Sequence, residues 1–197
     1  MLPVMASISC FALLSPYQRP VLLQPMRMLT ELNRMRFERT YELDVAKMGV
    51  DVEIRSAGKR GKGLFALRPF EADEIVAPYT GVFSTEEEFM KAQVEGRTSG
   101  DYVAEADPMW GSACMLDAED GSSTAFGRFV NHSLRKQNVY IMAARTTDDQ
   151  PTGLTYMVTT KKVPAGGEFF TNYGRGYWDE RFEGRFDPLG RLMVDYF

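Results

Sequence analysis

The stretch RFVNHS at residues 128–133 contains His132, the single histidine in a chain of 197 residues. An imidazole in such a place can act as a general base, bind a metal ion, or accept the hydrogen bonds that close a turn. No nucleophile elbow supports a Ser-His-Asp triad, and no second histidine exists to share a metal ion. From the residues alone, His132 is interpreted first as a structural residue.

A second candidate for chemistry is the glycine-rich stretch GKRGKG at 58–63. Val50, Val52 and Ile54 precede it and alternate with charged residues, which is the pattern of a half-buried strand. The apolar run LFAL follows it. Rossmann and Walker loops need a glycine turn that opens a helix. The stretch is therefore predicted to be a turn between two strands, with solvated lysines.

Two helices are predicted to flank or interrupt these strands. Apolar residues between 34 and 48 recur at spacings of four, four and three, which predicts a docked helix that ends at Gly49. Thr85 and Glu88 form a capping box for a second helix that runs to Glu95. The apolar stripe of the first helix consists of Phe37, Tyr41, Val45 and Met48.

Short strands account for most of the remaining chain. Apolar alternation bounded by turn residues predicts them. Helices and strands do not alternate regularly, which argues against a doubly wound α/β sheet. The expected fold is α+β, mostly β, built from small sheets. The further predicted strands lie at 74–79, 101–106, 139–145 and 154–163.

The composition is that of a globular protein, with 44% hydrophobic and 25% charged residues. A net charge of −4 is unfavourable for a protein that binds nucleic acid through its phosphates. It favours a basic substrate. Cys10 and Cys114 are the only cysteines, so no zinc site built from cysteines is expected. The low cysteine content also predicts a reducing compartment. No apolar run approaches the roughly 20 residues of a membrane span, so no membrane partner is expected.

Four motifs follow one another along the chain: the glycine turn and strand at 58–67, PYTG at 78–81, RFVNHS at 128–133 and GGEFFTNYG at 166–174. In this order they resemble the motifs of the SET-domain protein lysine methyltransferases, over about residues 50–174. The stretches GDYVAEA and CMLDAEDGSSTAFGRFVNHS are similar to the short members of that family, such as the histone H4 lysine monomethyltransferase.

The resemblance implies a SET fold whose C-terminal segment forms a pseudoknot and places NHS beside NYG. It implies S-adenosylmethionine as the methyl donor and a protein lysine, on a histone tail or nucleosome, as the acceptor. No sequence-specific contact with nucleic acid is expected. The residues that match cofactor contacts are Arg60, Gly61, Lys62, Tyr102, Asn131, His132 and Trp178.

Two tyrosines are candidates for the catalytic site. Tyr173 matches the tyrosine of the family's closing Y-G, and its hydroxyl would orient the lysine nitrogen or the methyl group. Tyr140 falls on an active-site tyrosine of some SET enzymes when counted from His132, although a count from Asn138 shifts the register by one residue. Thr171 stands where many relatives carry Phe or Tyr, which predicts room for more than one methyl group. The aromatic candidates also have an ordinary alternative role in packing.

The expected organisation is a leader at 1–30, a helical lead-in at 31–49, the SET domain at 50–174 with a variable insert at 84–116, and an aromatic flank at 175–197. Leu134 stands where many nuclear relatives carry a cysteine that helps to bind zinc and close the cofactor pocket. No metal is therefore expected here. The flank with Trp178 is expected to close the pocket instead. The acid-poor leader permits an organelle transit peptide, and otherwise an intracellular, nuclear location is expected.

Two other functions stay open from the sequence. One is a catalytically weak SET module that binds a peptide or a partner protein. The other ignores the resemblance and is a β-rich domain that binds peptides along an exposed strand edge. Binding of S-adenosylmethionine separates the lysine methyltransferase from the peptide-binding domain. Methyl transfer that is lost in Tyr173→Phe separates it from the weak SET module.

Overall fold

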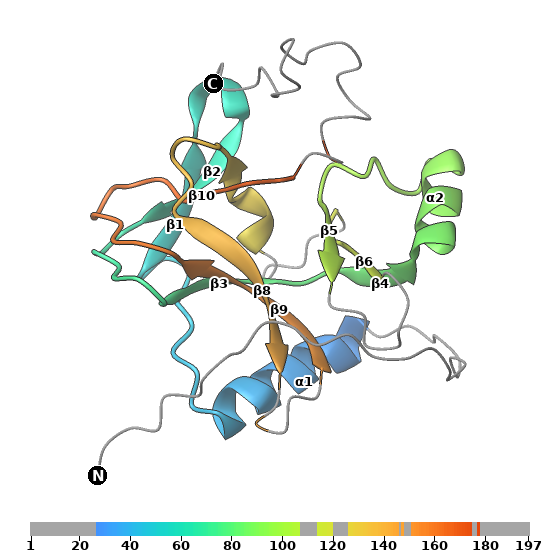
Figure 1. The fold of residues 1–197 in the computed structure, drawn as a ribbon, viewed down its shortest axis with the longest axis horizontal. Coiled ribbons are helices and arrows are strands. Elements are labelled where there is room, and N and C mark those ends of the chain that lie inside the picture. The colour runs from blue at the N-terminus through green and yellow to red at the C-terminus, as the bar shows by residue number, and fades with distance from the viewer. Residues whose placement is uncertain are drawn as a thin grey trace.

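The computed structural model describes residues 27–106, 114–119, 126–145, 147, 151–174 and 177. These residues form two α-helices, two short 3-10 helices and ten strands (Figure 1). The helices are α1 (Arg27–Thr40), η1 (Gly58–Arg60), α2 (Glu86–Val94) and η2 (Phe126–Phe129). The strands are β1 (Val52–Ser56), β2 (Lys62–Ala66), β3 (Ile75–Tyr79), β4 (Val82–Thr85), β5 (Val103–Ala106), β6 (Cys114–Asp117), β7 (Asn131–His132), β8 (Val139–Arg145), β9 (Pro151–Thr159) and β10 (Phe170–Thr171).

The described strands are arranged in small sheets. β1 and β2 form an antiparallel hairpin, and β7 and β10 form a parallel pair. Two three-stranded antiparallel sheets have the orders β3-β9-β8 and β4-β6-β5. In Figure 1 both α-helices lie at the periphery, with α2 beside the β4–β6 sheet. The prediction of a mostly β, α+β fold of small sheets is confirmed. None of the described helices is long and apolar enough to cross a membrane.

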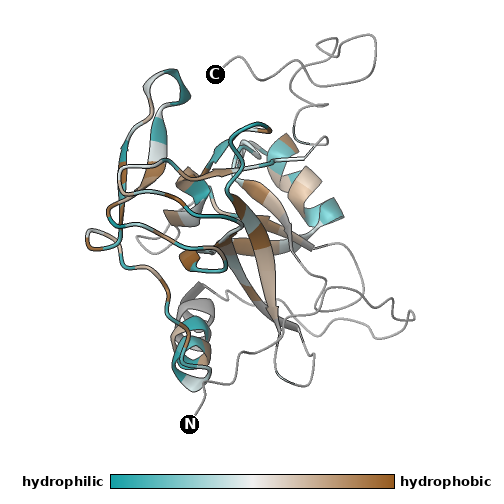
Figure 2. Ribbon diagram, turned by 60° about the vertical axis from the view of Figure 1, so that its left-hand side comes forward, coloured by the Kyte–Doolittle hydropathy of each residue, from teal (hydrophilic) through white to brown (hydrophobic). Residues whose placement is uncertain are grey.

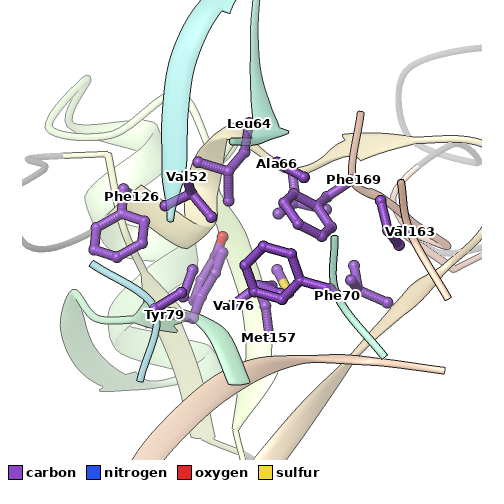
Figure 3. Close-up of a cluster of buried hydrophobic side chains, with 14 of the residues drawn as sticks. Val52, Leu64, Ala66, Phe70, Val76, Tyr79, Phe126, Met157, Val163 and Phe169 are labelled. Carbon is purple, nitrogen blue, oxygen red and sulfur yellow. The ribbon is translucent and has the colours of Figure 1, made fainter. Parts of the chain in front are cut away.

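Strand β9 is the central strand of its sheet, between β3 and β8, and both of its faces are covered. Alternate residues of a strand point to opposite faces of the sheet. Met157 therefore joins the main hydrophobic cluster, where the rings of Phe70 and Phe169 meet edge to face at 5.2 Å (Figure 3). Tyr156 and Val158 point the other way and join a second cluster. Figure 2 shows the apolar colour concentrated on these central strands.

The N-terminal helix begins earlier and ends earlier than the sequence predicted, so the predicted start at 31 and the predicted end at Gly49 are both wrong. α1 ends at Thr40. Glu42 then adopts a left-handed backbone conformation with φ 49°. The Leu43 N–H donates to the Glu38 carbonyl at 2.9 Å, which is the hydrogen bond that closes a Schellman-type helix end.

The rest of the predicted stripe packs without being helical. Val45 pairs with Ile75 and Met48 pairs with Val52, both as isolated bridges. Phe37 and Val45 nevertheless pack against the second hydrophobic cluster. The lead-in therefore docks on the sheet as expected, but part of it docks through backbone pairing with strands.

Two local predictions are confirmed. The glycine-rich stretch joins the antiparallel strands β1 and β2, and Gly61 has φ 78°, a conformation that glycine adopts without strain. At α2, the Thr85 hydroxyl accepts from the Glu88 N–H at 3.2 Å, and the Glu88 carboxylate accepts from the Thr85 N–H at 2.9 Å. This is the predicted capping box.

The parallel pair of β7 and β10 brings NHS and NYG together, as the resemblance implied. Asn131 is opposite Phe170, and His132 is opposite Thr171. Asn138 strengthens this junction: its side-chain oxygen accepts from the Phe170 N–H at 2.7 Å, and its amide donates to the Glu168 carbonyl at 2.9 Å. Segments about 40 residues apart therefore form one wall of the candidate functional site.

Candidate functional site

A cavity of about 400 Å³ lies between the glycine turn, strand β7 and the segment after β10. Its volume falls within the range of about 300 to 1,000 Å³ that is usual for small-molecule sites. The predicted site residues that line it are Arg60, Gly61, Lys62, Tyr102, Asn131, His132 and Tyr173. Its other lining residues are Asp101, Arg128, Phe129 and Tyr177.

The glycine turn forms one wall of the cavity. The Gly61 N–H donates to the Gly58 carbonyl at 3.0 Å, and the Gly61 carbonyl accepts from the Ala57 N–H at 2.8 Å. A Cβ placed on Gly61 would meet no heavy atom within 4 Å. The turn is thus internally hydrogen-bonded, and a ligand can approach its backbone without meeting a side chain at Gly61.

Asn131 and His132 use their side chains to join the walls. The Asn131 amide donates to the Lys62 carbonyl at 3.1 Å and to the Glu168 carboxylate at 2.9 Å. The Nδ1 atom of His132 accepts from the Tyr173 N–H at 3.1 Å. A neutral imidazole suits this contact, because Nδ1 must offer a lone pair.

Tyr173 is held on three sides. Its hydroxyl donates to the Val130 carbonyl at 2.9 Å, and its backbone N–H is held by His132. Its ring meets the ring of Tyr177 edge to face, with centroids 4.8 Å apart. Burial raises the pKa of Tyr173 above its ordinary value, and the neighbouring tyrosines add to the effect. The phenol therefore stays protonated at neutral pH.

Arg128 fixes the wall that carries Tyr102. Its guanidinium donates to the carbonyls of Ala118 at 3.1 Å and Glu119 at 2.6 Å, and it lies 5.0 Å from the centre of the Tyr102 ring. The Tyr102 carbonyl in turn accepts from the buried Tyr79 hydroxyl at 2.7 Å. Burial raises the pKa of Tyr79, so this hydroxyl also remains a donor at neutral pH.

The Glu119 side chain organises the loop that leads to Tyr102. Its carboxylate accepts from the Thr98 hydroxyl at 2.6 Å and from the Ser99 N–H at 2.5 Å. The hydrogen bond from Thr98, together with those from the loop backbone, lowers the pKa of Glu119. An ionised carboxylate thus fixes the loop just before Asp101 and Tyr102 enter the cavity wall.

The structure does not bring Tyr140 to this cavity. Tyr140 lies on β8 with 37% of its surface exposed, and its hydroxyl contacts the sulfur of Met142 at 3.8 Å. The buried neighbour in the strand is Val139, which is fully inaccessible. Thr171 is buried on β10 beside His132. Trp178 lies outside the described residues.

Four lining residues were not assigned to the cofactor site from the sequence, although three of them lie within quoted stretches and the fourth is next to Trp178. Arg128 and Phe129 begin RFVNHS, Asp101 precedes Tyr102, and Tyr177 precedes Trp178. A motif marks the segment that reaches a site, but the fold decides which of its side chains face the cavity. Among the described residues, no group of three or more His, Cys, Asp and Glu side chains could hold a metal ion.

Comparison with known protein families identifies residues 61–174 as a SET domain, which is more than half of the chain. The chain belongs to the SET domain family. Members of this family are protein lysine methyltransferases, and they generally use S-adenosylmethionine. The matched residues begin at Gly61 in the glycine turn and end at Gly174, directly after Tyr173.

Among solved structures, this SET domain is similar to the CpSET8 protein from Cryptosporidium, with a TM-score of 0.51 and 20% sequence identity. The similarity covers 63% of this chain and 57% of that chain, so it spans little more than half of the solved protein. At this identity the match shows a shared fold. No curated protein matches the chain.

Proposed function

We propose that this SET domain transfers a methyl group from S-adenosylmethionine to the side-chain amine of a protein lysine, with histone tails as the substrate class. The observation that carries the proposal is one cavity lined by three of the four ordered motifs, with the partly buried Tyr173 at its wall. The fourth motif contributes Tyr79, which supports the cavity wall through the Tyr102 carbonyl.

The residues around the cavity suit S-adenosylmethionine, which carries an adenine ring, a sulfonium cation and an amino-acid end with both charges. The rings of Tyr102, Phe129 and Tyr177 offer faces for stacking and for a cation. Asp101 and Arg128 offer charged partners of either sign. The backbone of the glycine turn and the Asn131-His132 pair would hold the rest of the molecule. When bound, S-adenosylmethionine would supply an electrophilic methyl group, which the amine attacks in line while the sulfur leaves as a neutral thioether.

Tyr173 orients the incoming amine in this proposal. Its hydroxyl proton is committed to the Val130 carbonyl, so only its oxygen lone pairs remain for a substrate. These lone pairs can accept an N–H of the lysine amine, which leaves the nitrogen lone pair free to point into the cavity. Because burial keeps the phenol protonated, its oxygen positions the amine as a neutral acceptor and not as a phenolate.

The surroundings of Tyr173 also favour the uncharged amine that the reaction needs. Tyr79 is buried and Tyr173 is partly buried, and a site with reduced access to water disfavours a charged ammonium. Aromatic rings at the cavity attract the ammonium before it loses its proton. The chain therefore contributes alignment and desolvation, and no residue has to act as a strong base.

A basic peptide suits the charge of the protein. The net charge is −4, and Asp101 lies in the cavity wall itself. The acidic run Glu86 to Glu88 is weaker support, because acidic residues in the first turn of α2 also stabilise the helix. A histone substrate implies a nuclear location, which imaging of the tagged full-length chain tests.

The decisive experiment has two stages. Calorimetry with the full chain should detect one binding site for S-adenosylmethionine. Labelled cofactor should then transfer its methyl group to histones or histone-tail peptides. Absence of cofactor binding would overturn the proposed activity. Binding with transfer only to other proteins in a lysate would retain the activity and reject the histone substrate.

Thr171 leads to a proposal about the product. This small side chain is buried beside His132 and two residues before Tyr173, where many relatives have a ring. We expect dimethyl or trimethyl lysine as the final product, and Thr171→Tyr should shift the product to the monomethyl form by filling the space. Mass spectrometry of a histone peptide at long reaction times measures this. A wild-type protein that stops at monomethyl lysine would reject it.

A further inference from the structure

The carboxylate of Glu168 joins three segments at the edge of the cavity. It forms an ion pair with Arg60 of the glycine turn at 2.6 Å, across 108 positions of sequence. Its other oxygen accepts from the Asn131 amide on β7 at 2.9 Å. The same amide donates to the Lys62 carbonyl at 3.1 Å. Glu168 is not a lining residue of the cavity, but all three of its neighbours in this network are.

The ion pair is shielded from solvent. The side chain of Glu168 is 10% exposed and that of Arg60 is 22% exposed. The Arg60 guanidinium also lies over the Phe170 ring, 5.2 Å from its centre. Charge-assisted hydrogen bonds between such shielded groups are stronger than bonds between exposed groups. The glycine turn therefore depends on a partner from the C-terminal end of the domain.

Gly63 supports the same interpretation from the other side. A Cβ placed there would lie 2.7 Å from a Glu168 carboxylate oxygen and 3.0 Å from the Asn131 amide nitrogen. The φ of Gly63 is not in the left-handed region. The Ala57 Cβ would lie 3.0 Å from the same point. Space for the carboxylate and for these two neighbours, and not backbone conformation, is thus the structural reason for a glycine at this position.

We propose that Glu168 is a positioning residue that sets the affinity of the cavity for S-adenosylmethionine by holding the glycine turn against strand β7. This inference rests on the proposed function. Without the carboxylate, Arg60 loses its ion-pair partner and the turn keeps only its own local hydrogen bonds. The turn must then be ordered by the cofactor on binding, which lowers the affinity.

The first test replaces the charge and keeps the shape. Glu168→Gln still offers an oxygen to Asn131 but no longer pairs with the Arg60 cation. The dissociation constant for S-adenosylmethionine should rise about tenfold in calorimetry, and KM for the cofactor should rise with it while kcat changes less than about threefold. The matched control is Glu71→Gln, which breaks an exposed ion pair with Lys162 and should change neither constant.

A double-mutant cycle separates positioning from a general structural effect. Arg60→Met removes the charge and keeps a straight side chain over Phe170. In that background, Glu168→Gln should weaken cofactor binding by less than about threefold, because the partner is already absent. An equal effect of Glu168→Gln with and without Arg60 would overturn the proposal, as would unchanged affinity in the single variant.

Gly63→Ala provides an independent perturbation if Glu168→Gln does not fold. Its methyl group displaces the carboxylate without removing its charge, so it should also raise the dissociation constant about tenfold, and unchanged affinity would overturn the proposal. Wild-type protein that does not bind S-adenosylmethionine rejects the proposed function. Wild-type protein that binds it while these variants bind equally well rejects only the role of Glu168.

Discussion

Tyr173→Phe tests the site most directly because it removes one oxygen atom with two separate roles. In the structure that oxygen donates to the Val130 carbonyl at 2.9 Å. In the proposed reaction its lone pairs orient the lysine amine. The ring contacts with His132 and Tyr177, at centroid distances of 5.4 Å and 4.8 Å, do not need the hydroxyl and should persist.

The two roles predict effects of different size. Val130 is 1% exposed, so in the variant its carbonyl loses a hydrogen-bond donor at a site that water does not reach. This loss lowers the free energy of unfolding by about 1–2 kcal/mol. For a domain of this size that lowers Tm by about 2–8 °C. Loss of the contact that aligns the amine should lower kcat about 100-fold, or about 2.7 kcal/mol in the activation free energy. The dissociation constant for S-adenosylmethionine should change less than about threefold.

Tyr156→Phe is the matched control. Tyr156 is fully buried in the second hydrophobic cluster, and its hydroxyl donates to the Glu38 carboxylate at 3.1 Å. Its loss should lower Tm by a similar amount and leave kcat unchanged. Methyl transfer from labelled cofactor and thermal unfolding measure both variants. Equal losses of kcat in the two variants, or a kcat for Tyr173→Phe within about threefold of wild type, would refute the reasoning.

Two further predictions concern residues that hold the site. His132→Ala removes the acceptor of the Tyr173 N–H and should weaken cofactor binding about tenfold or lower Tm. His132→Asn can offer an oxygen near the position of Nδ1 and should recover part of the loss. If calorimetry and thermal unfolding show equal defects for His132→Ala and His132→Asn, this role of the imidazole is contradicted. Glu119→Gln should lower Tm by about 2–4 °C at neutral pH, because the ionised carboxylate holds the loop at Thr98 and Ser99. The pKa of Glu119 is lowered in the folded protein, so its contribution to the free energy of unfolding is present above the ordinary pKa of a glutamate and is lost as pH falls through the lower folded value. The difference in Tm between Glu119→Gln and the wild-type protein should therefore shrink in acid. A Tm difference that does not depend on pH would show that the charge is not involved.

Local interactions explain which parts of the fold could be predicted. The capping box of α2 and the turn at GKRGKG depend on residues close in sequence, and both formed as expected. The end of α1 does not lie where it was predicted, because a spacing of four also suits residues that pair with separate strands. Val45 and Met48 lie outside the helix and instead pair with Ile75 and Val52 as isolated bridges.

Tyr140 shows the same limit at the site. Its register differed by one residue between a count from His132 and a count from Asn138, and a shift of one residue turns a strand side chain to the other face. Asn138 is anchored by hydrogen bonds to Phe170 and Glu168. That anchor directs Val139 inward and leaves Tyr140 37% exposed.

The sequence by itself determined the family, the order of its motifs and the segments that reach the cavity, because these depend on residue types and short spacings. Tertiary structure alone decided that Asp101, Arg128, Phe129 and Tyr177 line the cavity. It alone joined Glu168 to Arg60. The physical reason is that contacts between residues about 100 positions apart leave no periodic pattern in the sequence, since they exist only after the parallel pairing of β7 and β10 has brought the ends of the domain together.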